Sequence, residues 1–204
     1  MKTIKFLLII FLLNLTFTFP QQKTVYLGFI EGDIDLGLAP YVNRVINEAE
    51  KNNADAIIFK INTFGGRVDA ATQIKDAILS SKIKTVAFVN NRAISAGALI
   101  TLSCNTIVMA PGSNIGAATV VDQTGQKVGE KYQSYMRSEM RSTAEKNGRP
   151  TDIAQAMVDE RIVIPGLCDS TQLVTLTSEE AVKYKMADTI MNNLDDVLKY
   201  LNLE

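Results

Sequence analysis

Two short segments of the sequence could together form the centre of a serine hydrolase. Asn62 to Gly66 reads Asn-Thr-Phe-Gly-Gly, and Ala93 to Gly97 reads Ala-Ile-Ser-Ala-Gly. Paired glycines let a ligand approach the main chain closely, and the amide groups of such a turn can stabilise an oxyanion. The chain contains no histidine, so a nucleophilic serine in this sequence would need another base to take its proton.

Ser95 is the candidate nucleophile. The residues from Ser95 to Ser103 are small and apolar, which predicts a buried helix that follows a strand by a short loop. The N-terminus of that helix would lie beside the hydroxyl group, and the N–H of Ala96 would lack a partner within the helix. The structural alternative is that Ser95 serves only as an N-cap, for which serine is a favoured residue. The Gly65-Gly66 turn taken alone is likewise compatible with a simple connection between a strand and a helix.

A lysine is the remaining candidate for the base. Lysine side chains are normally protonated, with a reference pKa of about 10.4, and must be desolvated before they can accept a proton. Lys131 stands at the start of a predicted amphipathic helix, where partial burial and the helix dipole would disfavour its charged form. The alternative for any single lysine is a solvated surface residue. Lys127 is the nearby rival, but it lies in polar, loop-like sequence.

The composition excludes several classes of function. The chain has 204 residues, of which 47% are hydrophobic and 21% charged, as expected for one globular domain with a sizeable core. Its formal net charge is −1 and it has no long basic run, so nothing supports nucleic-acid binding. No G-x-x-x-x-G-K segment occurs, so we expect no coupling to ATP hydrolysis by the chain itself. We also expect no cofactor and no metal.

The first 20 residues differ from the rest of the chain. Lys2 and Lys5 precede an apolar core that runs from Phe6 to Leu13. This pattern is typical of a secretory signal, and its apolar core is shorter than the roughly 20 residues of a membrane span. We therefore expect residues 1–20 to be a signal peptide, with an uncleaved N-terminal anchor as the alternative. Residues 21–204 would then form one exported domain in a periplasmic or other extracytoplasmic compartment, tethered at most by its N-terminus.

The two cysteines, Cys104 and Cys168, do not make a disulfide framework. The apolar neighbours of Cys104 indicate a small core residue, and we expect the two thiols to be unpaired.

Hydrophobic periodicity after residue 23 predicts strands that alternate with helices. The expected strands are 24–30, 56–61, 85–89, 106–110 and 188–191, and the expected helices are 38–52, 68–79, 95–103, 131–146, 153–158 and 194–201. Glu31-Gly32-Asp33 is expected to be a turn, and Asn90-Asn91-Arg92 a loop. Thr177 and Glu180 have the spacing of a capping box at a further helix start. The alternation favours an α/β fold with largely parallel strands.

Four segments, residues 62–70, 93–97, 110–118 and 176–181, follow one another in the order and spacing of a known family. On these segments the chain resembles the N-terminal protease domain of the NfeD-like membrane-bound serine proteases, within the Clp protease/crotonase superfamily. The resemblance covers about residues 24–200 and implies a spiral of ββα units, with residues 21–204 forming a ClpP-like serine protease domain. Lys131 precedes Gly148-Arg149 by one helix, as the family's catalytic lysine precedes its own Gly-Arg.

The resemblance implies a serine–lysine dyad formed by Ser95 and Lys131. The oxyanion would be held by the backbone N–H groups of Gly65 and Ala96, and Gly66 would shape the turn and the groove for the substrate. An uncharged Lys131 would accept the proton of Ser95 as its oxygen attacks a peptide carbonyl.

The resemblance further implies an ATP-independent endopeptidase that cleaves apolar peptide segments of membrane-associated proteins, including stomatin-like membrane proteins. Relatives assemble through this domain, so a homo-oligomer is compatible with the sequence. The main alternative is an exported, non-catalytic protein-binding module with the same fold. A crotonase-type acyl-CoA enzyme is a second rival, but an export signal argues against it because coenzyme A chemistry is intracellular.

Overall fold

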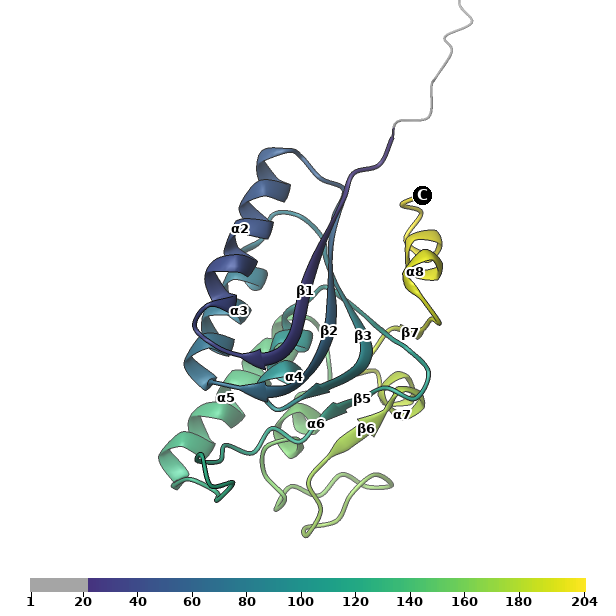
Figure 1. Ribbon diagram of the computed structural model, residues 1–204. Coiled ribbons are helices and arrows are strands. Elements are labelled where there is room, and N and C mark those ends of the chain that lie inside the picture. The colour runs from purple at the N-terminus through teal and green to yellow at the C-terminus, as the bar shows by residue number, and fades with distance from the viewer. Residues whose placement is uncertain (1–21) are drawn as a thin grey trace, which may run out of the picture.

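The computed structural model describes residues 22–204, so the expected signal peptide or anchor at residues 1–20 lies outside the described residues. The strands are β1 (Val25–Ile34), β2 (Ala56–Gly66), β3 (Thr85–Ile94), β4 (Thr106–Met109), β5 (Asn114–Gly116), β6 (Thr175–Thr177) and β7 (Thr189–Ile190). The helices are α2 (Leu38–Lys51), α3 (Val68–Ser80), α4 (Ala96–Ser103), α5 (Glu130–Lys146), α6 (Thr151–Ala156), α7 (Ser178–Lys183) and α8 (Leu194–Tyr200) (Figure 1). Within residues 22–204, no helix has the length and apolar character needed to cross a membrane.

The strands form one sheet of α/β type. Its main path runs β1-β2-β3-β4-β7 with parallel pairing throughout, while β5 pairs in parallel with β3 and antiparallel with β6. The predicted α/β class with largely parallel strands is therefore confirmed. Parallel strands are covered on both faces, which explains the continuous apolar runs of β2 and β3.

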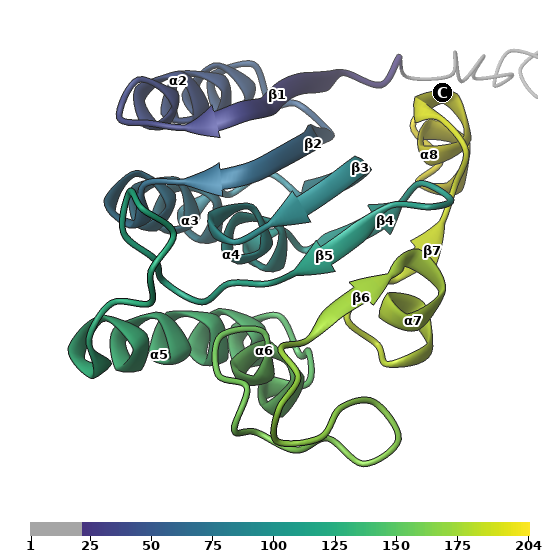
Figure 2. The same ribbon diagram turned by 60° about the horizontal axis from the view of Figure 1, so that its bottom comes forward.

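Helices cover the sheet unequally. In Figure 2, α2, α3 and α4 lie along one face, and α8 lies on the other. Successive residues of a strand point to opposite faces, so Ile57 and Phe59 of β2 join the large core with the first group of helices. Ile58 between them joins a smaller core with Val86 and with Val197 of α8.

Two expected connections are strand in the structure. Residues 31–33, expected as a turn, continue β1 through an irregularity in its pairing with β2 between Glu31 and Asp33. Residues 90–92, expected as a loop, continue β3, and Arg92 pairs with Asn114 of β5. Polar residues at both strand ends do not show the apolar pattern that predicts a strand. Strand pairing uses backbone groups, so it does not require apolar side chains at the margin of a sheet. The three-residue strands β5 and β6 were not expected for the same reason.

Other boundaries lie close to the expected ones. Helix α5 begins one residue earlier than predicted, at Glu130, whereas α6 covers 151–156 in place of 153–158. The capping box is confirmed, with the Thr177 hydroxyl accepting from the Glu180 N–H and the Glu180 carboxylate accepting from the Thr177 N–H. The two cysteines are free, and Cys104 is buried, both as expected.

The sheet positions the candidate site. Parallel strands end at the same edge, so the glycines that end β2 and the serine that follows β3 meet there. Strand β5 extends this edge, with Gly116 opposite Ile94.

Candidate active site

Ser95 occupies the junction between β3 and α4 with an unusual backbone conformation. Its φ is 57° and its ψ is −121°, a combination that costs free energy for a residue with a side chain. Its N–H donates to the carbonyl of Gly116 at 2.9 Å, which helps to hold the junction in place. The side chain makes no capping hydrogen bond, and the backbone does not have the extended conformation of a regular N-cap. A strained serine at a sharp strand-to-helix turn is instead an arrangement found for nucleophiles.

Gly65 lies directly against Ser95, so the structure brings the two sequence segments together. A Cβ added at Gly65 would lie 2.7 Å from the Ser95 Cβ and 3.1 Å from its Oγ, and the φ of Gly65 is +112°. At Gly66, an added Cβ would collide with the backbone of Ile34 in β1. Both glycines are therefore required by close approach, and Gly65 leaves one side of the serine hydroxyl open.

Thr63 is a member of this site that sequence reasoning missed. Its buried hydroxyl donates to the Gly32 carbonyl at 2.5 Å and accepts from the Gly65 N–H at 2.9 Å. Its methyl group fills the space where a Cβ of Gly97 would lie. Its position inside the Asn62–Gly66 segment was the available signal, but its role depends on β1, which lies 31 residues earlier in the chain.

The two expected oxyanion donors differ in the structure. The N–H of Ala96 is in the first turn of α4 and donates to no group among residues 22–204. The N–H of Gly65 is already bonded to Thr63, so it could serve an oxyanion only by exchanging that bond. Of these two N–H groups, that of Ala96 is therefore the one without a hydrogen-bond partner among residues 22–204.

Lys131 is the second residue of α5, but the expectation of partial burial is wrong because its side chain is exposed. It lines a cavity of about 650 Å³ between the N-terminal ends of α3 and α5. The cavity is bordered by Arg67, Val68, Asp69, Thr72, Val120, Val128, Lys131, Tyr132 and Tyr135. Helix α5 begins at a surface, so a side chain at its second position escapes the core that buries Met136 and Met140.

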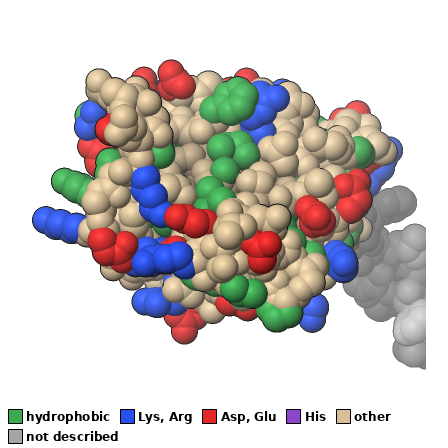
Figure 3. Space-filling view, turned by 90° about the horizontal axis from the view of Figure 1, so that it is seen from below, with side chains coloured by type: hydrophobic (Ala, Val, Ile, Leu, Met, Phe, Trp, Pro, Cys, Tyr) green, Lys and Arg blue, Asp and Glu red, His purple; other side chains and the backbone are tan. Residues whose placement is uncertain are grey.

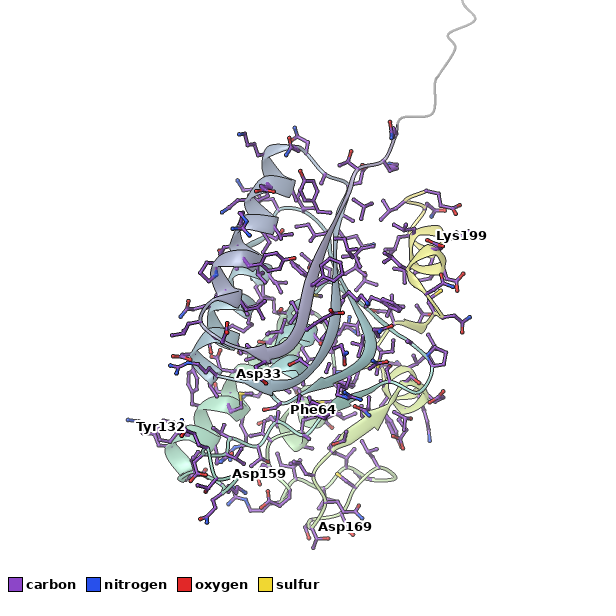
Figure 4. The ribbon with its side chains drawn as sticks, in the orientation of Figure 1. Asp33, Phe64, Tyr132, Asp159, Asp169 and Lys199 are labelled. Carbon is purple, nitrogen blue, oxygen red and sulfur yellow. The ribbon has the colours of Figure 1, made fainter. Side chains whose placement is uncertain are left out.

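A short piece of chain links the cavity to the serine, although neither Ser95 nor Gly65 lines the cavity. Gly65 contacts Ser95, and Arg67, two residues further along the chain, borders the cavity. Two residues span at most about 7 Å of chain. Figure 4 places Phe64 and Tyr132 toward the same end of the molecule, and Figure 3 views that end, where hydrophobic side chains form a broken strip between charged ones.

Phe64 is an exposed aromatic residue at this end of the molecule. The residue is 70% exposed, and the guanidinium of Arg92 stacks over its ring at 4.3 Å from the ring centroid. A cation over an aromatic face is attracted by the electrons of the ring, so the pair stabilises an exposed aromatic side chain directly before Gly65.

Lys127, the rival candidate for the base, forms an ion pair with Glu160. Its amino group donates to both carboxylate oxygens of Glu160, at 2.7 and 2.8 Å, and this contact lowers the pKa of Glu160. An ammonium held between two carboxylate oxygens is poorly suited to accept a proton. Lys131 differs, since it has no ion-pair partner among residues 22–204.

Hydrogen bonds and ion pairs between side chains hold the segments around Lys131 together. Gln133, which is buried, donates to the carbonyls of Val120 and Val128 and accepts from the Val120 N–H. Asp159, also buried, pairs with Arg137 of α5 and with Arg161, and the hydrogen bond from Arg161 holds its pKa well below the ordinary range. The start of α5 is thus tied to the segments before and after it.

Comparison with known proteins agrees with this geometry. A family model described as the N-terminal domain of NfeD1b matches residues 24–204. Membrane protein NfeD1b of Bacillus subtilis is 37% identical over 185 residues, covering 90% of this chain and 42% of that protein. Membrane-bound protease PH1510 of Pyrococcus horikoshii is 32% identical over 189 residues, covering 89% of this chain and 40% of that protein. The chain thus spans less than half the length of these two relatives.

Solved structures give the same result. A variant of the membrane-bound stomatin-specific protease 1510-N, with a serine replaced by alanine, superimposes with a TM-score of 0.77 and 31% identity, over 88% of this chain and 85% of that one. A second 1510-N variant, with a lysine replaced by alanine and a bound substrate peptide, has the same TM-score and identity, over 88% and 80%. ClpP1 of Listeria monocytogenes, at a TM-score of 0.64 and 23% identity over 84% and 94% of the two chains, shares the fold. The chain has the ClpP-like α/β fold and belongs to the NfeD1b N-terminal domain family.

Proposed function

We propose that this domain is a serine endopeptidase in which Ser95 is the nucleophile and Lys131 the general base. The observation that carries the proposal is the placement of a strained Ser95 against Gly65 at a strand-to-helix turn. Such a turn costs free energy and serves no capping role here, so a function for the hydroxyl accounts for it. The similarity to 1510-N, a protease, supports the same reaction class.

The proposed reaction starts with an uncharged Lys131 that swings from the cavity to the Ser95 hydroxyl and takes its proton. The serine oxygen attacks a peptide carbonyl, and the Ala96 N–H donates to the oxyanion. The Gly65 N–H joins it by leaving the Thr63 hydroxyl. Lys131 then returns the proton to the leaving amine, and water releases the acyl group from Ser95. Catalytic hydrogen bonds often tighten only when substrate binds, which is consistent with the exposed lysine of the free protein.

The cavity supports apolar peptide segments as substrates. Its wall includes Val68, Val120, Val128 and the rings of Tyr132 and Tyr135. These side chains would bury an apolar residue of the substrate and fix its position near Ser95. We further propose ATP-independent cleavage of membrane-associated proteins, with a stomatin-like protein as one candidate substrate, as the description of 1510-N suggests. Export, tethering by the N-terminus and homo-oligomerisation complete this proposal.

A non-catalytic peptide-binding module is the second candidate function. It is favoured by the exposed side chain of Lys131 and by the engaged N–H of Gly65. In such a module, the cavity and its exposed aromatic rim would hold a peptide without cleaving it.

The decisive experiment compares three variants on an apolar peptide library. Ser95→Ala and Lys131→Met should each abolish cleavage while peptide binding persists, and Ser95 alone should react with a fluorophosphonate probe. Lys127→Met is the matched control, because it removes a nearby lysine that is paired with Glu160, and its cleavage rate should stay within a few-fold of the parent. Cleavage that survives in a folded Ser95→Ala variant refutes the nucleophile. Tight binding without any cleavage by the parent protein supports the binding module.

A further inference from the structure

The cavity beside Lys131 contains one carboxylate. Of the side chains that border it within residues 22–204, Arg67 and Lys131 are basic, and Asp69 is the single acidic one. A carboxylate close to an amine favours the charged ammonium form, which cannot accept a proton. If Lys131 is the base, Asp69 is therefore the group in the cavity that most opposes its function.

Asp69 is occupied by Arg67. The Arg67 Nε donates to Oδ1 of Asp69 at 3.0 Å and its Nη2 donates to Oδ2 at 2.7 Å, a paired geometry that uses both carboxylate oxygens. Oδ1 also accepts from the Ala70 N–H at 2.9 Å. The hydrogen bonds that Arg67 donates to Asp69 lower the pKa of the Asp69 carboxyl and raise the pKa of the Arg67 guanidinium. The pair stands at the start of α3, where the helix dipole also favours a carboxylate.

The acidic groups around the start of α5 are also occupied. Glu130, the neighbour of Lys131 in α5, pairs with Arg137 and lies 3.7 Å from Arg161. In the segment after α6, Asp159 pairs with Arg137 and Arg161, and Glu160 pairs with Lys127.

In the segment before α5, the Asp122 carboxylate accepts from the N–H groups of Thr124 and Gln126 and from the Thr124 hydroxyl. Tyr132 and Tyr135 of α5 are the other titratable side chains that border the cavity, and neither carries a carboxylate. The carboxylate that borders the cavity and those that flank α5 in these segments thus each have a partner.

We propose that Arg67 is a positioning residue that withholds the Asp69 carboxylate from Lys131, and that this ion pair sets the lowest pH at which Lys131 can serve as base. The inference rests on the proposed peptidase function. The intact pair contributes almost no net charge beside Lys131. Loss of Arg67 leaves a negative charge that stabilises the ammonium, whereas loss of the Asp69 charge leaves a positive one that destabilises it. Shifts of opposite sign from substitution of Arg67 and of Asp69 distinguish this role from a general disturbance of the cavity.

The test is the pH profile of kcat/KM for cleavage of one apolar peptide. Arg67→Gln should move the acid limb to higher pH by roughly 0.5 unit, the size expected for an exposed ion pair. Asp69→Asn should move it to lower pH by a similar amount. The double variant Arg67→Gln/Asp69→Asn should return the limb to that of the parent protein. Shifts of the same sign in both single variants, or no shift in either, overturn the proposal.

A second measurement covers variants with weak activity. Reductive ¹³C-dimethylation of the lysines, with the Lys131 signal assigned by its loss in Lys131→Arg, reports the titration of this amine by NMR in each variant. The titration midpoint of Lys131 should move in the same direction as the acid limb in each of the three variants. A midpoint that neither single substitution moves refutes the role of Arg67. If Ser95→Ala and Lys131→Met abolish cleavage but the Arg67 and Asp69 variants leave the acid limb unmoved, this inference fails and the peptidase proposal stands. If those two variants cleave normally, the peptidase proposal itself fails.

Discussion

Replacing Gly65 with alanine tests whether the space beside Ser95 is needed for reaction. The added Cβ would lie 2.7 Å from the Ser95 Cβ, 3.1 Å from its Oγ and 3.2 Å from the Ile94 carbonyl oxygen, whereas ordinary contact begins at 3.4 Å. Relief of the closest contact requires a displacement of about 0.7 Å, and misplacing reacting groups by about 1 Å can lower a rate by roughly 100-fold. The backbone conformation, at a φ of +112°, would add a cost of about 1–3 kcal/mol in stability.

The assay measures the rate of fluorophosphonate labelling of Ser95 together with kcat/KM for peptide cleavage. We expect both to fall by about 10²-fold in Gly65→Ala, because the serine and the adjacent oxyanion site move together. Gly112→Ala is the matched control: its φ is +76°, but an added Cβ would meet nothing within 4 Å. The control should lose about 1–2 kcal/mol of stability and keep its labelling rate. A Gly65→Ala protein that is folded and labels as fast as this control would show that the close approach has no role in the reaction.

Two further predictions concern stability and thiol chemistry. Asp159→Asn should lower the free energy of unfolding at pH 7 by about 1 kcal/mol, because it removes the carboxylate charge that pairs with Arg137 and with the largely exposed Arg161, while Arg137 keeps Glu130 as a partner. The folded-state pKa of Asp159 is depressed, so the parent protein has this contribution in full above about pH 4 and loses it as the pH falls. The difference in free energy of unfolding between the two proteins, measured in urea, should therefore be smaller at pH 2.5 than at pH 7. An equal difference at both pH values contradicts the ion-pair explanation. In folded protein at pH 8, iodoacetamide should modify Cys168 and spare Cys104, since burial raises the pKa of the Cys104 thiol to about 12. Mass spectrometry should find both thiols modified once the chain is unfolded, and rapid modification of Cys104 in the folded state would contradict its burial.

The central strands were predictable from the sequence because their apolar runs reflect burial on both faces of a parallel sheet. The run from Ala56 to Ile61 is an example, and it forms the first part of β2. The continuation of that strand through Gly65-Gly66 was not predictable in this way, since its pairing with Asp33 and Ile34 depends on backbone groups of β1. Helix α5 was predictable because Met136, Met140 and Ala144 recur at helical spacing, and all three are buried. Tyr135, which precedes Met136 in the same helix, is 45% exposed and borders the cavity.

The sequence by itself determined the chemical inventory: a serine before small residues, a pair of glycines, no histidine and a lysine near a helix start. It also determined the order of the helices and of five of the seven strands in the described residues, because hydrophobic periodicity is a local property of the chain. Only the tertiary structure decided that Gly65 touches Ser95, that Thr63 occupies the Gly65 N–H, and that Lys131 is exposed. The contact of Gly65 with Ser95 joins residues far apart in the chain, and all three features follow from strand register and helix packing, which local residue types do not specify.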